Sequence, residues 1–402
     1  MNHVPTAESV WDLVVVGGGP AGATAAHDAA RQGLSVLLLD RDGRIKPCGG
    51  AIPPRLIRDF DIPESLLVAH ARCARMISPA DQKVDIPIEN GFVGLVDREV
   101  FDEWLRVRAA DAGAVRRRGL FRQIDSPENG PCTLQAEDPE SGAPFTLRAR
   151  SVIGADGARS AVAQQTVRGA DRGKFVFAYH EIIQTPAPDS AGADVDPSRC
   201  DVYYRGSLSP DFYGWVFPHG PTMSVGTGSA DKGFSLRSAV GRLRDAAGLA
   251  DARTIRREGA PIPLKPLPRW DDGRHVVLAG DAAGVVAPAS GEGIYYAMLG
   301  GRLAAEAAVA YVRSGDARAL KQARKRFMRE HGRVFWVLGV MQWFWYRSDR
   351  LRERFVSICR DKDVQQLTFD AYMNKRLVRR KPMAHLRIFA KDVAHLLGLA
   401  RV

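Results

Sequence analysis

The chain has 402 residues, of which 45% are hydrophobic and 26% charged, and this length allows two domains or one large core with an inserted module. No run of about 18 apolar residues occurs and the five cysteines form no C-x-x-C pair, which argues against a membrane-spanning helix, a disulfide framework and a zinc site. Most of the net charge of +11 comes from residues 347–402, which hold 14 Lys and Arg against 6 Asp and Glu. Such a basic segment suggests an anionic partner, with a solvated helical surface as the alternative.

A glycine-rich turn follows the first expected strand. Residues 13–16 are a short β-branched apolar run typical of a buried parallel strand, and Gly17, Gly19 and Gly22 follow it in G-x-G-x-x-G spacing. The first glycine permits a tight turn, the second lets the backbone approach a pyrophosphate, and the third lets the next helix pack close to the strand. The N-terminus of that helix offers N–H groups and a positive dipole end to phosphates. We expect a dinucleotide-binding turn, with an ordinary β-α-β turn as the alternative.

A second expected strand, residues 36–39, ends in Asp40, about 20 residues beyond the turn. A carboxylate at this strand tip accepts hydrogen bonds from a ribose, and Arg41 follows it directly. Residues 41–54 are then expected to form a loop because of their Gly and Pro content. Because the first strand begins so early in the chain, we expect no signal or transit peptide.

The next part of the chain alternates between helical and strand patterns. Residues 54–60 and 96–112 are expected to be helices, the second with an apolar face at helical spacing. Short strands then alternate with turns as far as residues 151–154, which form a short apolar strand. Asp156 and Gly157 follow it, in a turn expected to face a second nucleotide-binding element.

Residues 172–268 change character, with strand-like segments between turns rich in Pro, Gly and Asp, and they predict an antiparallel sheet. The αβ pattern returns with a strand at 275–279 and a long helix at 292–312, and the chain beyond residue 315 is expected to be helical. A nucleotide-binding domain interrupted by a β-rich module is therefore expected. Its strand-like segments are residues 175–183, 201–204, 213–217 and 223–227.

Two further motifs suit a flavin nucleotide. Gly280 and Asp281 follow an apolar strand, and a carboxylate beside a flexible turn is the acceptor that ribityl hydroxyls need. Gly291 and Gly293 precede a helix beginning at Ile294. The N–H groups of that helix are placed to face the N1/C2=O edge of a flavin, where a reduced flavin carries negative charge.

At these motifs the sequence resembles the FAD-dependent oxidoreductases with the p-hydroxybenzoate hydroxylase fold. The resemblance implies an α/β fold, with a Rossmann-like FAD-binding domain, an inserted antiparallel β-sheet substrate domain and a helical C-terminal region. It implies that the glycine-rich turn binds ADP, that the Asp-Gly motif lies near the flavin and that the Gly-Asp motif binds ribityl and pyrophosphate. Arg98 matches an arginine used near the FAD, and Phe121 matches a position that contacts adenine. Asp40 stands where this group more often has Glu, and the shorter acid still reaches a ribose.

The resemblance makes the FAD-binding domain discontinuous, because the β-rich module interrupts it. The expected FAD-binding domain takes residues 10–75, 92–171 and 269–315, the β-rich substrate domain takes 76–91 and 172–268, and the helical, basic C-terminal region takes 316–402.

Two segments resemble the geranylgeranyl reductases of this fold, in particular the branch that makes phytyl chains for chlorophyll and bacteriochlorophyll. The K-P-C-G-G stretch matches their cysteine-glycine loop and carries Cys48, Gly49 and Gly50. Residues 210–218 match their P-x-x-Y-x-W-x-F-P segment. The resemblance implies stepwise reduction of three of the four double bonds of a geranylgeranyl group, on the pigment ester or on the diphosphate. It also implies NADPH as the reductant, although another donor remains the alternative because the chain has a single dinucleotide fingerprint.

The resemblance assigns Tyr213, Trp215, Phe217 and Pro218 to a wall of the prenyl cavity, and core packing of an aromatic stripe is the alternative. Tyr213 is a candidate proton donor, with an ordered water molecule as its rival. Cys48 is a second catalytic candidate and is expected to contact the flavin, with the filling of a small buried space as the alternative.

Other functions of this fold remain open. An archaeal-lipid-type prenyl reductase and a flavin monooxygenase are the enzymatic alternatives, and a non-catalytic flavoprotein scaffold at the photosynthetic membrane is the alternative from another class. Flavin halogenases share the fold, but they resemble W-x-W-x-I-P where this chain has Tyr213 to Pro218, and their lysine beside a glycine-rich loop is not found here.

The aromatic residues 334–346 are too few to span a bilayer, and a buried helix is the default expectation. Interfacial aromatics followed by a basic segment also suit a helix lying on an anionic membrane. We therefore expect peripheral association with the cytoplasmic face of a bacterial photosynthetic inner membrane. No nucleic-acid recognition motif accompanies the basic segment. His180, His219 and His275 lie in strand contexts and are expected to be structural, so no metal is expected.

Overall fold

The computed structural model describes residues 10–41, 46–88, 91–187 and 194–366, together with Met373 and Lys375. The chain divides into two compact units, each made of several segments. The first unit comprises the described residues of Met1–Lys46, Arg98–Phe175 and Pro261–Gly332, and the second unit those of Pro47–Asp97, Val176–Ala260 and Arg333–Val402.

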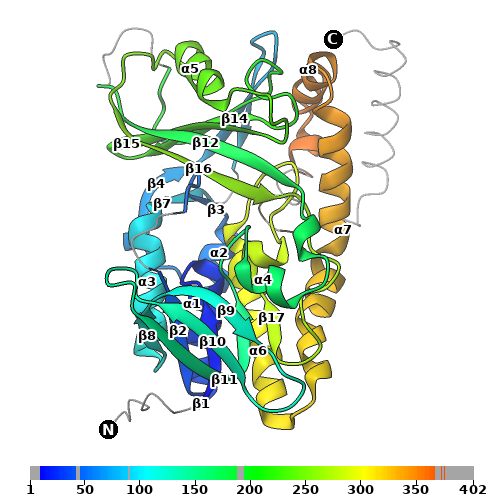
Figure 1. Cartoon of the computed structure of the whole chain (residues 1–402). Coiled ribbons are helices and arrows are strands. Elements are labelled where there is room, and N and C mark those ends of the chain that lie inside the picture. The colour runs from blue at the N-terminus through cyan, green and yellow to red at the C-terminus, as the bar shows by residue number, and fades with distance from the viewer. Residues whose placement is uncertain are drawn as a thin grey trace. The chain divides into compact units, whose positions relative to one another are not determined.

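The first unit is built on a largely parallel sheet (Figure 1). Its strands are β1 (Val10–Val16), β2 (Val36–Asp40), β8 (Val115–Arg118), β9 (Leu120–Asp125), β10 (Cys132–Glu137), β11 (Pro144–Gly154) and β17 (Val276–Leu278). They lie in the order β8-β2-β1-β11-β10-β9, and β17 pairs with the end of β11. The pairs β8-β2, β2-β1, β1-β11 and β11-β17 are parallel, whereas β9 and β10 are antiparallel to their neighbours. The carboxyl ends of β1, β2, β11 and β17 therefore share one edge, where open α/β sheets bind ligands.

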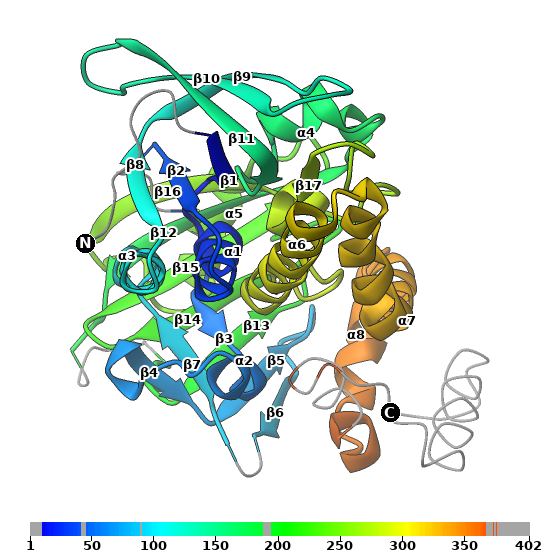
Figure 2. The ribbon, with the colours of Figure 1, turned by 90° about the horizontal axis from the view of Figure 1, so that it is seen from below.

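Helix α1 (Pro20–Arg31) lies between α3 (Arg98–Asp111) and α6 (Ile294–Ser314) and packs against both, as Figure 2 shows. The approach to α6 is close because a Cβ added at Gly301 would lie 2.1 Å from the carbonyl oxygen of Ala21 in α1. Helix α7 (Lys321–Trp345) begins in the first unit and ends in the second. The helices are α1 (Pro20–Arg31), α3 (Arg98–Asp111), α4 (Ala161–Thr166), η2 (Ala170–Arg172), η3 (Gly280–Ala283), α6 (Ile294–Ser314), η4 (Ala317–Leu320) and α7 (Lys321–Trp345).

The second unit holds a large, mostly antiparallel sheet and a small one. The large sheet consists of β16 (Thr254–Pro263), β12 (Phe175–Gln184), β15 (Thr222–Ser229), β14 (Gly214–His219), β13 (Arg199–Tyr203), β5 (Cys73–Ile77) and β6 (Lys83–Pro87), in this order. The small sheet consists of β3 (Ala51–Ile52), β7 (Val93–Val96) and β4 (Leu67–Ala71). The helices of this unit are α2 (Pro54–Asp59), η1 (Glu64–Leu66), α5 (Leu236–Ala246) and α8 (Asp349–Ile358).

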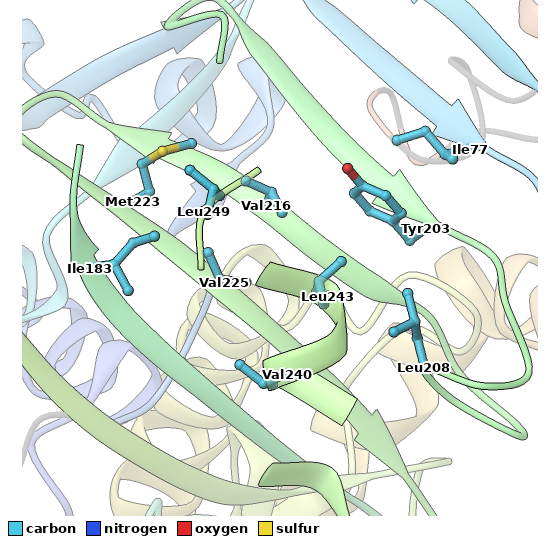
Figure 3. Packing of buried hydrophobic residues seen from close by; sticks show 10 residues of the cluster. All are labelled: Ile77, Ile183, Tyr203, Leu208, Val216, Met223, Val225, Val240, Leu243 and Leu249. Carbon is cyan, nitrogen blue, oxygen red and sulfur yellow. The ribbon is translucent and has the colours of Figure 1, made fainter. Parts of the chain in front are cut away.

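One face of the large sheet is covered by α5 (Figure 3). Val216 and Val225 project from neighbouring strands into an apolar cluster that also contains Val240 and Leu243 of α5. Because side chains alternate along a strand, Trp215 and Phe217 point to the opposite face of β14 from Val216. The apolar residues of β14 therefore face both sides of the sheet, and α5 covers only the side that carries Val216.

The fold class expected from the sequence is confirmed. The large sheet is not wholly antiparallel, because β13 pairs in parallel with β5, a strand from a distant part of the chain. The unit boundaries also differ from those expected. Residues 47–75 belong to the second unit because β3 and β4 pair with β7 there, and the expected separate region 316–402 is divided within α7. Among the helices in the described residues, none combines the length and the apolar character needed to cross a bilayer.

Candidate cofactor site and aromatic face

The turn after β1 brings three backbone segments into close contact. Gly17 has a φ of +104°, and its N–H donates a hydrogen bond to the carbonyl of Leu39 at 2.8 Å. A Cβ at Gly17 would lie 2.4 Å from the carbonyl oxygen of Ala155, and a Cβ at Gly22 would lie 1.8 Å from the carbonyl oxygen of Gly17. Only glycine fits at these two positions, so the first and third glycines of the motif have structural tasks.

Gly19 differs from its two partners in the motif. It is the N-cap of α1 with a φ of −73°, and no side chain caps the helix there. A Cβ added to Gly19 would meet no atom within 4 Å. The N-terminus of a twelve-residue helix therefore opens onto free space, where its first N–H groups are presented to a ligand.

Asp40 lies beside the same turn. A Cβ at Gly18 would be 2.6 Å from the Oδ2 atom of Asp40. The Arg106 guanidinium, from α3, lies 3.6 Å from this carboxylate and donates to the carbonyl of Gly18 at 3.2 Å. The backbone N–H of Arg41 donates to the other carboxylate oxygen at 2.9 Å. Phe121 is buried in β9, a strand that begins directly after β8, the neighbour of β2.

The Asp156 carboxylate has a task that the sequence did not indicate. It accepts hydrogen bonds from the backbone N–H groups of Ala161 at 2.7 Å and Val162 at 3.2 Å, and from the hydroxyl of Ser160. It thus caps α4, and burial raises its pKa. Gly157 has a φ of +92°, and a Cβ there would meet no atom within 4 Å. In this Asp-Gly motif, the part with free space beside it is therefore the backbone at Gly157.

The Gly-Asp motif packs against α1. Gly280 has a φ of +64°, and a Cβ there would lie 2.7 Å from the Cβ of Ala21. Asp281 is buried and forms an ion pair with the ammonium group of Lys46. A buried carboxylate is stabilised by such a partner, so Lys46 joins the loop before the cysteine-glycine segment to this motif.

The segment that leads into α6 contains two residues with positive φ angles. Gly291 has a φ of +63°, and Ala289 also has a φ of 63°, in the left-handed region that glycine favours. Gly293 is the N-cap without a side-chain cap, and Ile294 is the buried first residue of the helix. The Glu292 carboxylate accepts a hydrogen bond from one backbone N–H of the first turn at 2.9 Å. The expected helix start is present, with an acidic side chain on one of its N–H groups.

Arg98 is buried at the start of α3. Its guanidinium forms a two-point ion pair with Asp102 one turn later, at 2.9 and 2.7 Å. The described bonds of this side chain thus hold the first turn of α3. Its expected place near the FAD remains a prediction.

The edge of the first unit's sheet is suited to hold a dinucleotide such as FAD. The open N-terminus of α1 at Gly19 offers N–H groups for a pyrophosphate, and Asp40 offers a carboxylate for a ribose. Asp281 offers a second carboxylate, close to the N-cap of α6. Among the described residues, no group of three or more His, Cys, Asp and Glu side chains is arranged to bind a metal.

In the second unit, the cysteine-glycine loop packs directly on β14. The N–H of Gly50 donates to the Sγ atom of Cys48 at 3.4 Å. A Cβ at Gly49 would lie 2.9 Å from the ring of Phe217, and a Cβ at Gly50, where φ is +68°, would lie 2.6 Å from Nε2 of His219. Both glycines are therefore needed for this contact. Burial lowers the pKa of His219 to about 4.

We call Tyr213, Trp215 and Phe217 the aromatic face. Their ring centroids are 6.1 and 6.4 Å apart in sequence order, so they form a continuous row. Gly226, on the neighbouring strand β15, gives room for the middle ring, because a Cβ there would lie 2.3 Å from Cζ2 of Trp215. Pro218 is buried directly after this row in β14. The structure therefore brings the three aromatic residues and the cysteine-glycine loop together.

Several side chains at these sites carried no sequence signal. Arg106 lies in an ordinary charged helix, and only the fold shows that it reaches the glycine-rich turn. Lys46 belongs to the K-P-C-G-G match, but its partner lies 235 positions along the chain. The role of Gly226 could be recognised only once the register of β14 and β15 was known.

The sequence is similar to curated proteins along nearly its whole length. A family model described as FAD dependent oxidoreductase matches residues 12–61. The chain is 58% identical to the geranylgeranyl diphosphate reductase of Rhodobacter capsulatus, over 97% of this chain and 98% of that protein. It is 37% identical to the chloroplastic geranylgeranyl diphosphate reductase of Oryza sativa, over 96% and 86%. The digeranylgeranylglycerophospholipid reductase 2 of Methanothermobacter thermautotrophicus is more distant, with 31% identity over 80% and 84%.

Solved structures share the fold. A geranylgeranyl bacteriochlorophyll reductase-like protein from Thermoplasma acidophilum has a TM-score of 0.79 and 24% identity, over 94% of this chain and 99% of that one. The flavin-dependent brominase Bmp2 has a TM-score of 0.73 and 16% identity, over 96% and 99%. At this level of identity the two structures establish the fold alone.

Proposed function

Because the chain belongs to the geranylgeranyl diphosphate reductase family of FAD-dependent oxidoreductases, we propose that it reduces the double bonds of a geranylgeranyl group stepwise, three of the four, to give a phytyl group. The single observation that carries the proposal is the 58% identity to the Rhodobacter capsulatus reductase over 97% of the chain. A match over 97% of the chain takes in residues of both units. The archaeal-lipid-type reductases are more distant relatives, which favours a geranylgeranyl diphosphate reductase over a reductase of archaeal lipids.

Bound FAD, in its reduced form, supplies the hydride for this reaction. The first unit's task is to hold the cofactor, for which we propose the open α1 N-terminus at Gly19 and the carboxylates of Asp40 and Asp281. Arg106 orients the Asp40 carboxylate from the side of α3, at 3.6 Å. The remaining positions of the motif, Gly17 and Gly22, shape the turn and do not need to touch the ligand.

The second unit's task is to hold the prenyl chain and deliver a proton. A chain of isolated alkenes offers no polar handle, so flat apolar rings such as those of the aromatic face are the groups that orient it. Tyr213 is half-buried and stacks on Phe212 with ring centroids 4.3 Å apart, which limits the movement of its hydroxyl. We propose Tyr213 as the proton donor, with ordered water as the alternative. Full activity of the reduced Tyr213→Phe variant would exclude Tyr213.

The electron donor and the form of the substrate are the finer parts of the proposal. NADPH is the proposed reductant, and it binds transiently because the chain carries one dinucleotide fingerprint. The proposed substrates are geranylgeranylated (bacterio)chlorophyll and geranylgeranyl diphosphate. The name of the rice relative supports a plastid role for that protein, and a corresponding pigment pathway is proposed here for this one.

The activity is tested by product analysis without oxygen. The FAD-loaded protein is reduced, mixed with geranylgeranyl diphosphate or a geranylgeranyl pigment, and the products are weighed by mass spectrometry. We expect dihydro and tetrahydro intermediates to precede the phytyl product when substrate is in excess. Oxygen uptake with a hydroxylated product would favour a monooxygenase, and failure of every prenyl substrate to oxidise the flavin would favour a non-catalytic scaffold.

We also propose that the second half of α7 rests on an anionic membrane surface. Trp336, Val340 and Trp343 are 71%, 44% and 65% exposed and lie at helical spacing on one stripe. Arg333 and Arg347 are exposed at the two ends of this stripe, and the Arg347 guanidinium lies 4.7 Å from the Trp343 ring. Exposed tryptophans flanked by arginines suit the headgroup region of a bilayer with anionic lipids. A second copy of the chain suits this stripe less, since antiparallel pairing would place arginine against arginine.

The membrane proposal is tested by flotation with vesicles of phosphatidylcholine alone or mixed with phosphatidylglycerol. The protein is expected to float with the anionic vesicles, and the double variant Trp336→Ser/Trp343→Ser is expected to lose most of this binding. Val100→Ser is the matched control, because Val100 is 57% exposed on α3 and lies outside the stripe. Equal binding of the double variant would contradict the assignment, and a change of oligomeric state instead would indicate a self-association surface.

A further inference from the structure

A string of hydrogen bonds runs behind the middle ring of the aromatic face. The Nε1–H group of Trp215 donates to Oγ of Ser224 at 3.1 Å. The Ser224 hydroxyl and Nδ1 of His180 are 2.9 Å apart, and Nε2 of His180 lies 2.9 Å from the Glu258 carboxylate. The string crosses the sheet through β14, β15, β12 and β16. Ser224 is 0% and His180 2% exposed, so bulk water does not compete for these bonds.

For a neutral His180 and an ionised Glu258, the chemistry of the four groups gives the string one direction. An indole N–H is only a donor, so the Ser224 oxygen accepts from Trp215. The hydroxyl proton of Ser224 is then free to go to Nδ1 of His180, which leaves the Nε2–H of the imidazole to donate to Glu258. The Glu258 carboxylate is in turn paired with Arg256 at 2.9 Å. Every described member of the string therefore has a partner when His180 is neutral.

This direction decides between two roles for the string. A proton relay needs a final group that both accepts and donates a proton, and the indole of Trp215 does not accept one. The string is therefore suited to hold the ring rather than to feed protons to it. Gly226 supports the same ring from the sheet, since the space of a Cβ there is taken by Trp215 and by the Cβ of His180, at 2.3 and 2.5 Å.

We propose that His180 and Glu258 are positioning residues that act through Ser224 to hold the Trp215 indole in one orientation, and that this orientation sets how a prenyl chain is registered along the aromatic face. The inference rests on the proposed function. Trp215 is the middle ring of the row, so a rotation of its indole changes the surface on both sides of it. A reductase that treats successive double bonds of one chain depends on such a register, because each bond must reach the same position.

The test breaks the string at successive links and measures product ratios. Ser224→Ala and His180→Phe each remove the anchor of the indole, and we expect the ratio of partly to fully reduced chains, at equal substrate conversion, to rise by about fivefold, the size expected for one lost buried hydrogen bond. The double variant is expected to match the single ones, because both break the same string. Glu258→Gln keeps an oxygen that accepts from Nε2–H and is expected to stay within about twofold of the wild type.

A spectroscopic readout and a matched control separate positioning from general stability. The emission of Trp215 is obtained by subtracting the spectrum of Trp215→Phe in each background, and we expect it to shift in Ser224→Ala. Glu181→Gln is the control, because Glu181 also lies on β12 but bonds to Arg244 of α5 on the opposite face. This variant is expected to lower the melting temperature without changing the product ratio.

The outcomes distinguish this inference from the proposed function. If the wild type forms reduced prenyl products and the Ser224 and His180 variants give the same product ratio and the same Trp215 emission, the positioning role is wrong. If their rates and melting temperatures fall but the ratio stays constant, the string has only a structural role, which also overturns the proposal. If the wild type forms no reduced prenyl product, the proposed function itself fails, and the Trp215 emission alone then reports whether the string holds the ring.

Discussion

The glycine-rich turn and the aromatic face are shaped by opposite means. At the turn, glycines make room for backbone: the oxygen of Gly17 takes the place of a Cβ at Gly22. On the aromatic face, glycines make room for side chains: the rings of Phe217 and Trp215 take the places of Cβ atoms at Gly49 and Gly226. The contact at the turn joins residues only five positions apart in the sequence. The contacts on the aromatic face join residues that come together only when distant segments of the chain pack or pair. For this reason the turn is visible in the sequence as a motif, and the aromatic face only as a resemblance.

The largest effect is expected at the turn itself. Gly22→Ala places a Cβ 1.8 Å from a backbone oxygen that cannot move without opening the contact of β1 with α1. We expect a loss of more than about 3 kcal/mol in the free energy of unfolding, measured by denaturant titration or, in the extreme case, as loss of soluble protein. Gly241→Ala is the control, since a Cβ at this exposed position in α5 would meet no atom within 4 Å. Alanine there is expected to raise the free energy of unfolding by at most about 1 kcal/mol. Equal stability of Gly22→Ala and the wild type would contradict the packing described.

A smaller but more selective effect is expected from Gly226→Ala. The new methyl group displaces the indole of Trp215, so we expect turnover to fall by about thirtyfold while the affinity for FAD stays that of the wild type. FAD affinity is measured by fluorescence titration of the apoprotein, and turnover by anaerobic product analysis. Loss of FAD binding together with turnover would show that the two regions do not have separate tasks.

The sequence predicts what is encoded locally and misses what depends on distant partners. The strand, glycine turn, helix and Asp40 could be placed because their tasks follow from spacing within one βαβ segment. The place of Asp156 near the flavin stays a prediction, and the motif does not indicate that this carboxylate caps α4 through two backbone N–H groups. The boundary at residue 47 and the contact of Gly49 with Phe217 depend on pairing across the chain, which periodicity does not reveal.

Gly19→Ala tests the open end of α1 with a milder expected effect. A Cβ there meets no protein atom, and the φ of −73° suits alanine, so the apoprotein is expected to melt within about 2 °C of the wild type. Affinity for FAD is expected to fall by about tenfold, because the methyl group stands where the backbone approaches the ligand. Calorimetric titration of both apoproteins with FAD provides the comparison. Unchanged affinity would remove the α1 N-terminus from the cofactor site.

The smallest effect concerns pH and the loop beside the aromatic face. Burial lowers the pKa of His219 to about 4 from 6.5, so the folded protein binds fewer protons than the unfolded chain between these values. Stability therefore falls as the pH is lowered from 6.5 towards 4. For a half-buried side chain we expect roughly 1–2 kcal/mol over this window. His219→Gln is expected to flatten this part of the profile, measured by urea unfolding at several pH values; an unchanged slope would contradict the assignment.

The proposed function rests on a flavin, bound by this protein, that reduces the double bonds of a prenyl chain. Anaerobic reoxidation of the reduced flavin, followed by its absorbance after geranylgeranyl diphosphate or a geranylgeranyl pigment is added, tests this claim most directly. We expect the absorbance to return in the wild type and in Gly241→Ala, and to return much more slowly in Gly226→Ala with its full complement of FAD. Flavin that stays reduced with every prenyl substrate in the wild type would contradict it.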